Sequence, residues 1–355
     1  MSKQKNTAYT SPQSLGGRLP LRTAIPLGLQ HVLAMFVGNL TPLIIVMGVC
    51  SITENTLRLS LLQNAMLVAG LITVLQLYPI GPIGSGLPIV MGTSSGFIGI
   101  NRGIAVSMMG AAGAGAVGIA EGSAEAGIYA YGCIMGACII GGIFEAGLGF
   151  AIKPLRKLFP PVVTGTVVTA IGLSLIGVGI GFFGGGNTAA DYGTMWNLFL
   201  GLVTLIAILL FKHFTHGFAS AAAILFGIVV GYLVSFVMGL LLPSSIVIDG
   251  KEVIPGYITQ WHKVAEAKWF AVPSILPVKP QFNLGAILPM LLMFIVTAVE
   301  TVGDTAGVTK GGLNRDPSDK ELAGSVICDG VGSTVAALFG VLPNTSFSQN
   351  VASSV

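Results

Sequence analysis

Two carboxylic acids late in the chain have the spacing of a functional pair. Glu300 and Asp304 are four residues apart, so on a helix they lie on one face, and they follow a long uncharged run from Leu284. A charge at the centre of a bilayer is disfavoured by at least ~2.5–3.5 kcal/mol, so a carboxylate at that depth is expected only where it has a structural or functional role. Two close carboxyl groups favour a proton on one of them, which could leave with a substrate. Alternatively, the pair lies solvated at a helix end, which nearby Lys310 supports for Asp304.

Three further ionisable residues lie inside apolar runs. Asp329, within Cys328-Asp329-Gly330, is either a structural acceptor for neighbouring helix ends or a proton-coupling group. His31, early in the first apolar run, is either a helix–helix hydrogen-bond donor or a functional residue. Glu145 has no partner in the sequence pattern and is expected to face a loop or a cavity. Ionisable residues in such runs are candidates for substrate or proton pathways.

The composition explains which elements must position these residues. Only 9% of the 355 residues are charged, 53% are hydrophobic and 50 are glycine, which is typical of helices packed in lipid. These values exclude an ordinary soluble enzyme, a disordered chain, a collagen and a disulfide scaffold. The net charge of +3 is too small to indicate a nucleic-acid partner. The four cysteines form no CxxC pair and are expected to be packing residues.

The apolar runs predict an all-α polytopic membrane protein. A bilayer crossing needs about 20 apolar residues. Eight runs satisfy this length: 25–46, 59–80, 126–150, 160–183, 193–212, 217–242, 284–306 and 321–341. Two shorter pieces, 87–101 and 343 onward, each begin at a Leu-Pro pair and continue into Thr and Ser residues. They are expected to be broken helices.

The distribution of basic residues predicts the orientation. With the N-terminus in the cytoplasm, most Lys and Arg residues lie inside, in the N-terminal tail, at 153–157 and at 310–320. Arg58, Arg102 and the lysines of 243–283 are expected outside. If 87–101 did not cross, the basic cluster at 153–157 would lie outside. Both short pieces are therefore expected to cross the membrane.

The two broken helices are the third and tenth crossings, which fits two inverted seven-helix repeats. Irregular backbone at membrane depth must line a cavity or be buried in protein, and half-helix N-termini there suit a polar ligand. Ser94–Phe97 and Phe347–Asn350 are therefore expected to face one another. The alternative is that both are connecting loops. Four more crossings would complete the second repeat, so the 355-residue chain is expected to be truncated, unstable and inactive in transport.

Motifs of soluble enzymes are missing from the sequence. Gly177-Val-Gly-Ile-Gly resembles a dinucleotide-binding loop in its letters, but it lies inside an apolar helix rather than after a strand. One enzymatic alternative is an intramembrane aspartyl protease built on Asp304 and Asp329. Val302-Gly303-Asp304 carries the Gly-Asp of such sites, but the preceding glycine is replaced by Thr301, and Asp329 follows Cys328 rather than Tyr, which disfavours this alternative.

Four segments resemble the nucleobase–ascorbate transporters, also called nucleobase:cation symporters. They cover the chain from about residue 20 to its end and occur in the family's order: Gln30-His-Val-Leu-Ala-Met-Phe, Leu87-Pro-Ile-Val-Met-Gly-Thr-Ser, Glu300-Thr-Val-Gly-Asp304, and Asn344-Thr-Ser-Phe-Ser-Gln349-Asn350. The resemblance implies a fourteen-crossing fold with a core and a gate domain, often dimeric through the gate. The core would comprise 25–158 and 284–355, the gate 159–242, with a cytoplasmic tail at 1–24 and an extracellular loop at 243–283.

The resemblance also implies a site. Glu300 would accept hydrogen bonds from a base, Gln349 would bind the opposite edge, and Asn350, Ser94, Ser95 and Phe97 would complete the binding residues. Asp304, Asp329 and His31 would support geometry and proton coupling. Two departures stand out. Ser95 occupies a position where the family usually has an aromatic residue, for which Phe97 is a substitute, and Ala352 replaces the usual glycine.

The predicted function is proton-coupled uptake of a purine, xanthine or uric acid, across the cell membrane, with the proton as coupling ion and no other cofactor. The purine choice comes from the resemblance of Ser-Phe-Ser-Gln349-Asn350 to the oxidised-purine branch. The alternatives are a uracil or other nucleobase symporter, and a sulfate or bicarbonate transporter of the same fold. An anion carrier requires a cation between the half-helix ends, and the sequence has no Lys or Arg there.

Overall fold

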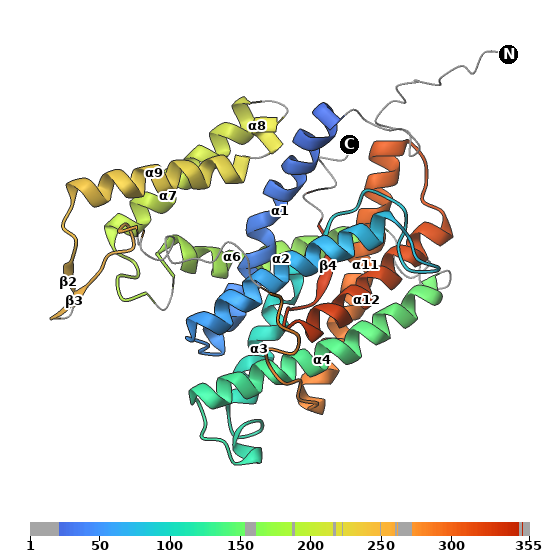
Figure 1. Ribbon diagram of the computed structural model, residues 1–355, viewed down its shortest axis with the longest axis horizontal. Coiled ribbons are helices and arrows are strands. Elements are labelled where there is room, and N and C mark those ends of the chain that lie inside the picture. The colour runs from blue at the N-terminus through green and yellow to red at the C-terminus, as the bar shows by residue number, and fades with distance from the viewer. Residues whose placement is uncertain are drawn as a thin grey trace. The chain divides into compact units, whose positions relative to one another are not determined.

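A computed structural model gives the fold of the chain (Figure 1). It describes residues 21–152, 161–186, 189–215, 218–221, 223–248, 250–259, 261, 272–347 and 350. Two units are present. The first contains the described residues up to Val168 and from Pro273 onward, and the second spans Thr169–Val272. The binding residues expected from the sequence fall in the first unit.

The helices of the first unit agree closely with the predicted crossings. They are α1 (Leu21–Val49), α2 (Asn55–Leu77), α3 (Ile98–Met109), α4 (Ala124–Phe150), α11 (Leu284–Leu313) and α12 (Asp319–Leu338). Six helices of the described chain are long and apolar enough to cross a membrane: α2, α4, α7, α9, α11 and α12. The predicted all-α, multi-spanning membrane architecture is therefore confirmed.

The second unit holds most of α6 (Pro161–Phe183), followed by α7 (Met195–Phe214), α8 (Phe218–Ala221) and α9 (Ala223–Leu241). The run 217–242, predicted as one crossing, thus contains a short and a long helix. A hairpin of β2 (Ile246–Ile248) and β3 (Lys251–Val253) follows. Just beyond it, the Gly256 N–H donates to the buried Asp191 carboxylate (2.6 Å), which holds this loop to the end of α6 and the start of α7.

The two predicted interruptions are present as strands. The third crossing consists of β1 (Met91–Thr93), a 3-10 turn η1 (Ser95–Phe97) and α3, and a second 3-10 turn, η2 (Gly115–Val117), precedes α4. The tenth begins with β4 (Asn344–Ser346). One placement was wrong: Arg58 and Arg102, expected in outside loops, are helical residues of α2 and α3. The helix after the first break continues past residue 101 to Met109 because no glycine–proline turn interrupts it there.

Helix α4 is the packing centre of the first unit, and α12 and α11 lie along it (Figure 1). Glycines permit the close approach. A Cβ added at Gly330 of α12 would lie 2.4 Å from the Gly142 carbonyl oxygen and 2.3 Å from the Ala146 nitrogen of α4. At Gly136, an added Cβ would lie 2.1 Å from the Gln281 carbonyl oxygen. Small residues at such contacts let helix backbones touch, which replaces the hydrophobic driving force that lipid cannot supply.

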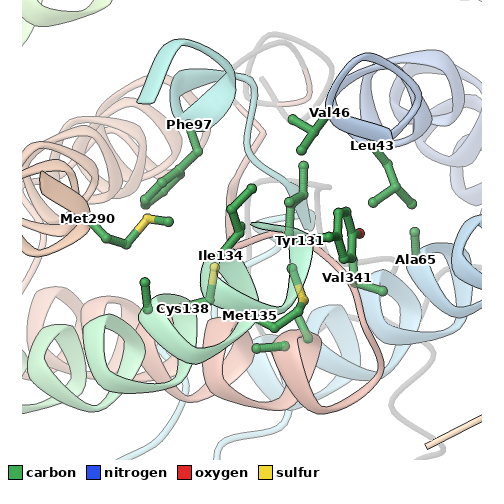
Figure 2. Close-up of a cluster of buried hydrophobic side chains, with 14 of the residues drawn as sticks. Leu43, Val46, Ala65, Phe97, Tyr131, Ile134, Met135, Cys138, Met290 and Val341 are labelled. Carbon is green, nitrogen blue, oxygen red and sulfur yellow. The ribbon is translucent and has the colours of Figure 1, made fainter. Parts of the chain in front are cut away.

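Apolar side chains fill the space between these helices (Figure 2). Leu43 and Val46 of α1, Ile134 of α4 and Met290 of α11 meet in one cluster. The Tyr131 ring lies among them, and its hydroxyl donates to the Gly340 carbonyl (2.7 Å), so its polar end is satisfied. The cluster fixes α4 against the segment that leads from α12 into β4.

Substituting Gly330 by alanine tests the glycine contact. The added methyl group would meet backbone atoms that cannot move cheaply, so we expect destabilisation of about 1–3 kcal/mol. The measurement is the thermal unfolding of the detergent-solubilised protein. Gly147→Ala on α4 is the matched control, because its added Cβ would meet nothing within 4 Å. Equal melting temperatures for the two variants would contradict the packing described.

Candidate functional site

The two broken crossings meet as an antiparallel ribbon. In the register, Met91 lies opposite Ser346, Gly92 opposite Thr345 and Thr93 opposite Asn344. Beyond the strands, the Ser94 N–H donates to the Pro343 carbonyl (2.8 Å) and the Phe347 N–H to the Val90 carbonyl (2.9 Å). The pairing therefore joins the two broken crossings directly before the segments expected to face one another, Ser94–Phe97 and Phe347–Asn350; residues 348 and 349 lie outside the described residues, and that expectation stays a prediction. Antiparallel pairing puts Ser94 and Phe347 at opposite ends of the ribbon.

Side chains of three helices satisfy the outer edges of this ribbon. Asn39 of α1 accepts from the Thr93 N–H (2.7 Å). Thr73 of α2 accepts from the Met91 N–H (3.0 Å). Ser333 of α12 accepts from the Asn344 N–H (3.0 Å) and donates to the Asn344 carbonyl (2.9 Å). Backbone groups away from water must be paired, so these polar residues inside apolar helices are what allow a ribbon at this depth.

The acidic residues of α11 and α12 contact β4. Asp329 is fully buried and accepts hydrogen bonds from the hydroxyls of Thr301 and Thr345, the latter at 3.1 Å. Asp304 accepts from the Ser346 hydroxyl (2.7 Å). Because α11 continues to Leu313, Asp304 is not at a helix end, and the alternative of a solvated terminal carboxylate does not apply. Both aspartates therefore anchor the second strand.

Glu300 lies one turn before Asp304 and is partly buried. Its Oε2 atom is buried and has no hydrogen-bond partner among the described residues. The same holds for the hydroxyl oxygens of Thr93 and Ser94, at the end of the first strand. Buried polar atoms are normally paired, so each of these three atoms is a candidate for a hydrogen bond to a polar ligand.

Ser95 and Phe97 differ in their surroundings. Ser95 is partly exposed, at the start of η1. Phe97 is fully buried and its ring packs against Phe294 of α11, with the ring centroids 4.8 Å apart. Figure 2 shows it beside Met290 in the apolar cluster. Phe97 therefore has the environment of a core residue in this conformation, and its contact with a substrate stays a prediction.

His31 and Asn350 are brought together, although 319 residues separate them. The Asn350 amide donates to the His31 carbonyl (3.0 Å) and lies 3.1 Å from His31 Nδ1. Asn350 is buried and His31 is partly buried. The pair connects α1 to the segment that follows β4. Gln349, the other expected binding residue of this segment, lies outside the described residues.

Several residues of the site were not predicted from the sequence. Asn39, Thr301 and Thr345 were given no role, and Glu145 was noted without a partner. Each is fully or almost fully buried. Asn39 could have been found from the sequence, because an amide side chain inside an apolar helix needs a hydrogen-bond partner. Thr301 could not, because a threonine hydroxyl in a helix can bond to a backbone carbonyl one turn earlier and so does not indicate another partner. In the described parts of the chain, no three His, Cys, Asp or Glu side chains are grouped so that they could hold a metal ion.

Comparisons with known proteins agree on one family. A model described as the permease family, Xan_ur_permease, matches residues 22–353. A Clostridium perfringens protein named as a purine permease, CPE0397, is 34% identical over 99% of this chain and 69% of its own length. The uric acid permease PucJ of Bacillus subtilis is 33% identical over 91% of this chain and 64% of its own length. The xanthine permease XanP of Escherichia coli is 28% identical over 95% of this chain and 67% of its own length. The chain thus spans about two thirds of these relatives.

A solved structure supports the fold. The transmembrane domain of the cyanobacterial bicarbonate transporter BicA superposes with a TM-score of 0.56 over 95% of this chain and 78% of that domain, at 14% identity. Two sequences this different share only the fold. The family model matches nearly the whole chain, so this chain belongs to the permease family that its motifs resemble, the nucleobase–ascorbate transporters. This is a family of membrane transport proteins and not of enzymes.

Proposed function

We propose that the protein takes up a purine base, xanthine or uric acid, together with protons across the cell membrane. The relatives named as xanthine and uric acid permeases support the purine class. The cytoplasmic N-terminus, the dimer through the gate and the division into a core and a gate remain parts of this proposal. In it, the core moves against the gate around the bound base.

The observation that carries the proposal is the unpaired Oε2 atom of Glu300. Oxidised purines present ring N–H donors beside C=O acceptors. The Glu300 carboxylate suits the N–H groups, and the unpaired hydroxyls of Thr93 and Ser94 suit a carbonyl. A bound base with both kinds of group would pair these three atoms, which removes the free-energy cost of leaving them buried and unpaired.

The other residues have supporting roles. Gln349 would bind the opposite edge of the base, and Ser95 would extend the hydroxyl surface next to Ser94. Asn350 and His31 would hold the segment that carries Gln349, since they bond to one another. Asp304 and Asp329 would fix β4 through Ser346 and Thr345 and take part in proton coupling.

An anion transporter is the second candidate, because BicA has the same fold. An anion site requires cations or unopposed N–H groups. Among the described residues, the charged side chains that are buried are all acidic: Glu145, Asp191 and Asp329. Asp329, which accepts a hydrogen bond from Thr345 of β4, is one of them, and a negative charge there would repel sulfate or bicarbonate, so a neutral base is favoured. Uptake of labelled xanthine, uracil and sulfate into proteoliposomes separates the three substrate classes.

Replacing Glu300 by glutamine tests the binding site. The neutral amide is a weaker acceptor than a carboxylate, and the loss of a charged hydrogen bond, about 1.5–3 kcal/mol, predicts about 10- to 100-fold weaker xanthine binding. The measurement is equilibrium binding of tritiated xanthine to the purified protein that contains this sequence.

The matched control is Glu54→Gln, at an exposed position before α2. It should bind xanthine as the wild type does. Glu300→Gln should also insert and melt normally, because Oε2 has no described partner to lose. Unchanged affinity of Glu300→Gln would refute the assignment of this residue.

The coupling ion is tested by gradients in proteoliposomes. An inward proton gradient should drive xanthine accumulation above equilibrium, and a protonophore should abolish it. The physical reason is that a buried carboxyl group with few hydrogen-bond donors and no cation beside it is less costly in the membrane as the neutral acid, so it can take up a proton on one side and release it on the other. Accumulation that follows a sodium gradient and survives the protonophore would overturn proton coupling, but not the substrate class.

A further inference from the structure

Glu145 is a buried carboxyl group that the site described above does not use. It lies in the last third of α4 and is fully buried. Its Oε1 atom is 3.0 Å from the Thr297 hydroxyl of α11, and Oε2 has no partner among the described residues. The acidic groups whose charges act on it are Asp329 of α12 and Glu300 of α11. Helix α3, which also packs on α4, carries one charged residue, the exposed Arg102.

The Thr297 hydroxyl shows in which form Glu145 fits. A hydroxyl has one hydrogen and can also accept. Thr297 Oγ1 lies within reach of three oxygen atoms, Glu145 Oε1 and the carbonyls of Met293 (3.3 Å) and Phe294 (3.2 Å) of its own helix. The nearest of these is Glu145 Oε1, and the hydroxyl donates to it, so the carboxyl group has one neutral donor and, among the described residues, no buried cation near it. Burying a charge with so little compensation is costly, and the neutral, protonated form of Glu145 therefore fits this place better.

Asp329 has more hydrogen-bond donors than Glu145. Two hydroxyls, those of Thr301 and Thr345, donate to its Oδ2 atom, while its Oδ1 atom, like Oε2 of Glu145, has no partner among the described residues. Hydrogen bonds to a carboxylate favour its charged form, so Asp329 is the better placed of the two to carry a negative charge and Glu145 to carry a proton.

We propose that Glu145 holds the proton that crosses the membrane with the base. An O–H bond forms on the Glu145 carboxylate with a proton from the outer solution while Glu300 binds the base. The bond breaks when that proton passes to water on the inner side, so one proton accompanies one base. The complete burial of Glu145 is the property required of an occluded ion site. The inference rests on the proposed function, to which it adds a proton-binding residue.

The test uses Glu145→Gln in proteoliposomes of the protein that contains this sequence, with tritiated xanthine and an internal pH dye. The amide keeps the shape and an acceptor oxygen for the Thr297 hydroxyl, but it cannot release a proton. Exchange of internal for external xanthine needs no net proton movement and should persist. Accumulation driven by a proton gradient should fall to simple equilibration, and internal acidification on xanthine addition should vanish. Glu125→Gln, at an exposed position in the first turn of α4, is the matched control and should behave as wild type.

The outcomes separate the two levels of the proposal. If the wild type neither exchanges nor accumulates xanthine, the proposed function itself fails. If Glu145→Gln accumulates xanthine and acidifies the vesicles like wild type, or if it loses exchange while remaining folded, the proton-binding role is overturned.

Thr297→Val provides a second variant should Glu145→Gln not fold. It leaves the acid in place and removes its hydrogen-bond partner. The pH at which uptake is half-maximal should move by about one unit, with exchange retained. An unchanged pH profile would also refute the inference.

Discussion

The structure depends on one constraint, which is that backbone groups inside a membrane must find hydrogen bonds within the protein. Two crossings are interrupted by strands, β1 and β4, whose backbone groups cannot bond within a helix. Each strand supplies hydrogen-bond partners to the other. Their outer edges are then completed by Asn39, Thr73 and Ser333, from three different helices. Because the backbone of the ribbon is paired in this way, the side-chain hydroxyls of Thr93 and Ser94 at its end can bind a ligand without leaving backbone groups unpaired. The proposed site therefore depends on these backbone hydrogen bonds.

The glycine contacts serve the same end. The ribbon is held in place only if α12, which carries Ser333 and Asp329, is fixed relative to α4 and α11. Gly142 and Gly330 bring α4 and α12 into backbone contact, and Gly136 does the same for the segment before α11. This packing explains why Glu145 of α4 and Asp329 of α12 both accept hydrogen bonds from threonines of α11, Thr297 and Thr301.

The sequence predicted the crossings well because each depends on local composition. Apolar runs and the Leu87-Pro88 and Leu342-Pro343 breaks are readable in a single segment, and the helices match them closely. The register of the ribbon was not readable. It depends on hydrogen bonds between residues more than 250 positions apart, such as Phe347 with Val90. The environment of Phe97 was missed for a similar reason, because a core contact with Phe294 and a ligand contact look alike in sequence. The site roles themselves remain predictions.

We propose that a purine base binds between Glu300 and the ribbon of β1 and β4. An experimental structure of the protein with bound xanthine tests this most directly. We expect planar density with a ring N–H within hydrogen-bond distance of Glu300 Oε2, and a carbonyl toward Thr93 or Ser94. Xanthine density elsewhere, with Glu300 Oε2 still unpaired, would contradict it.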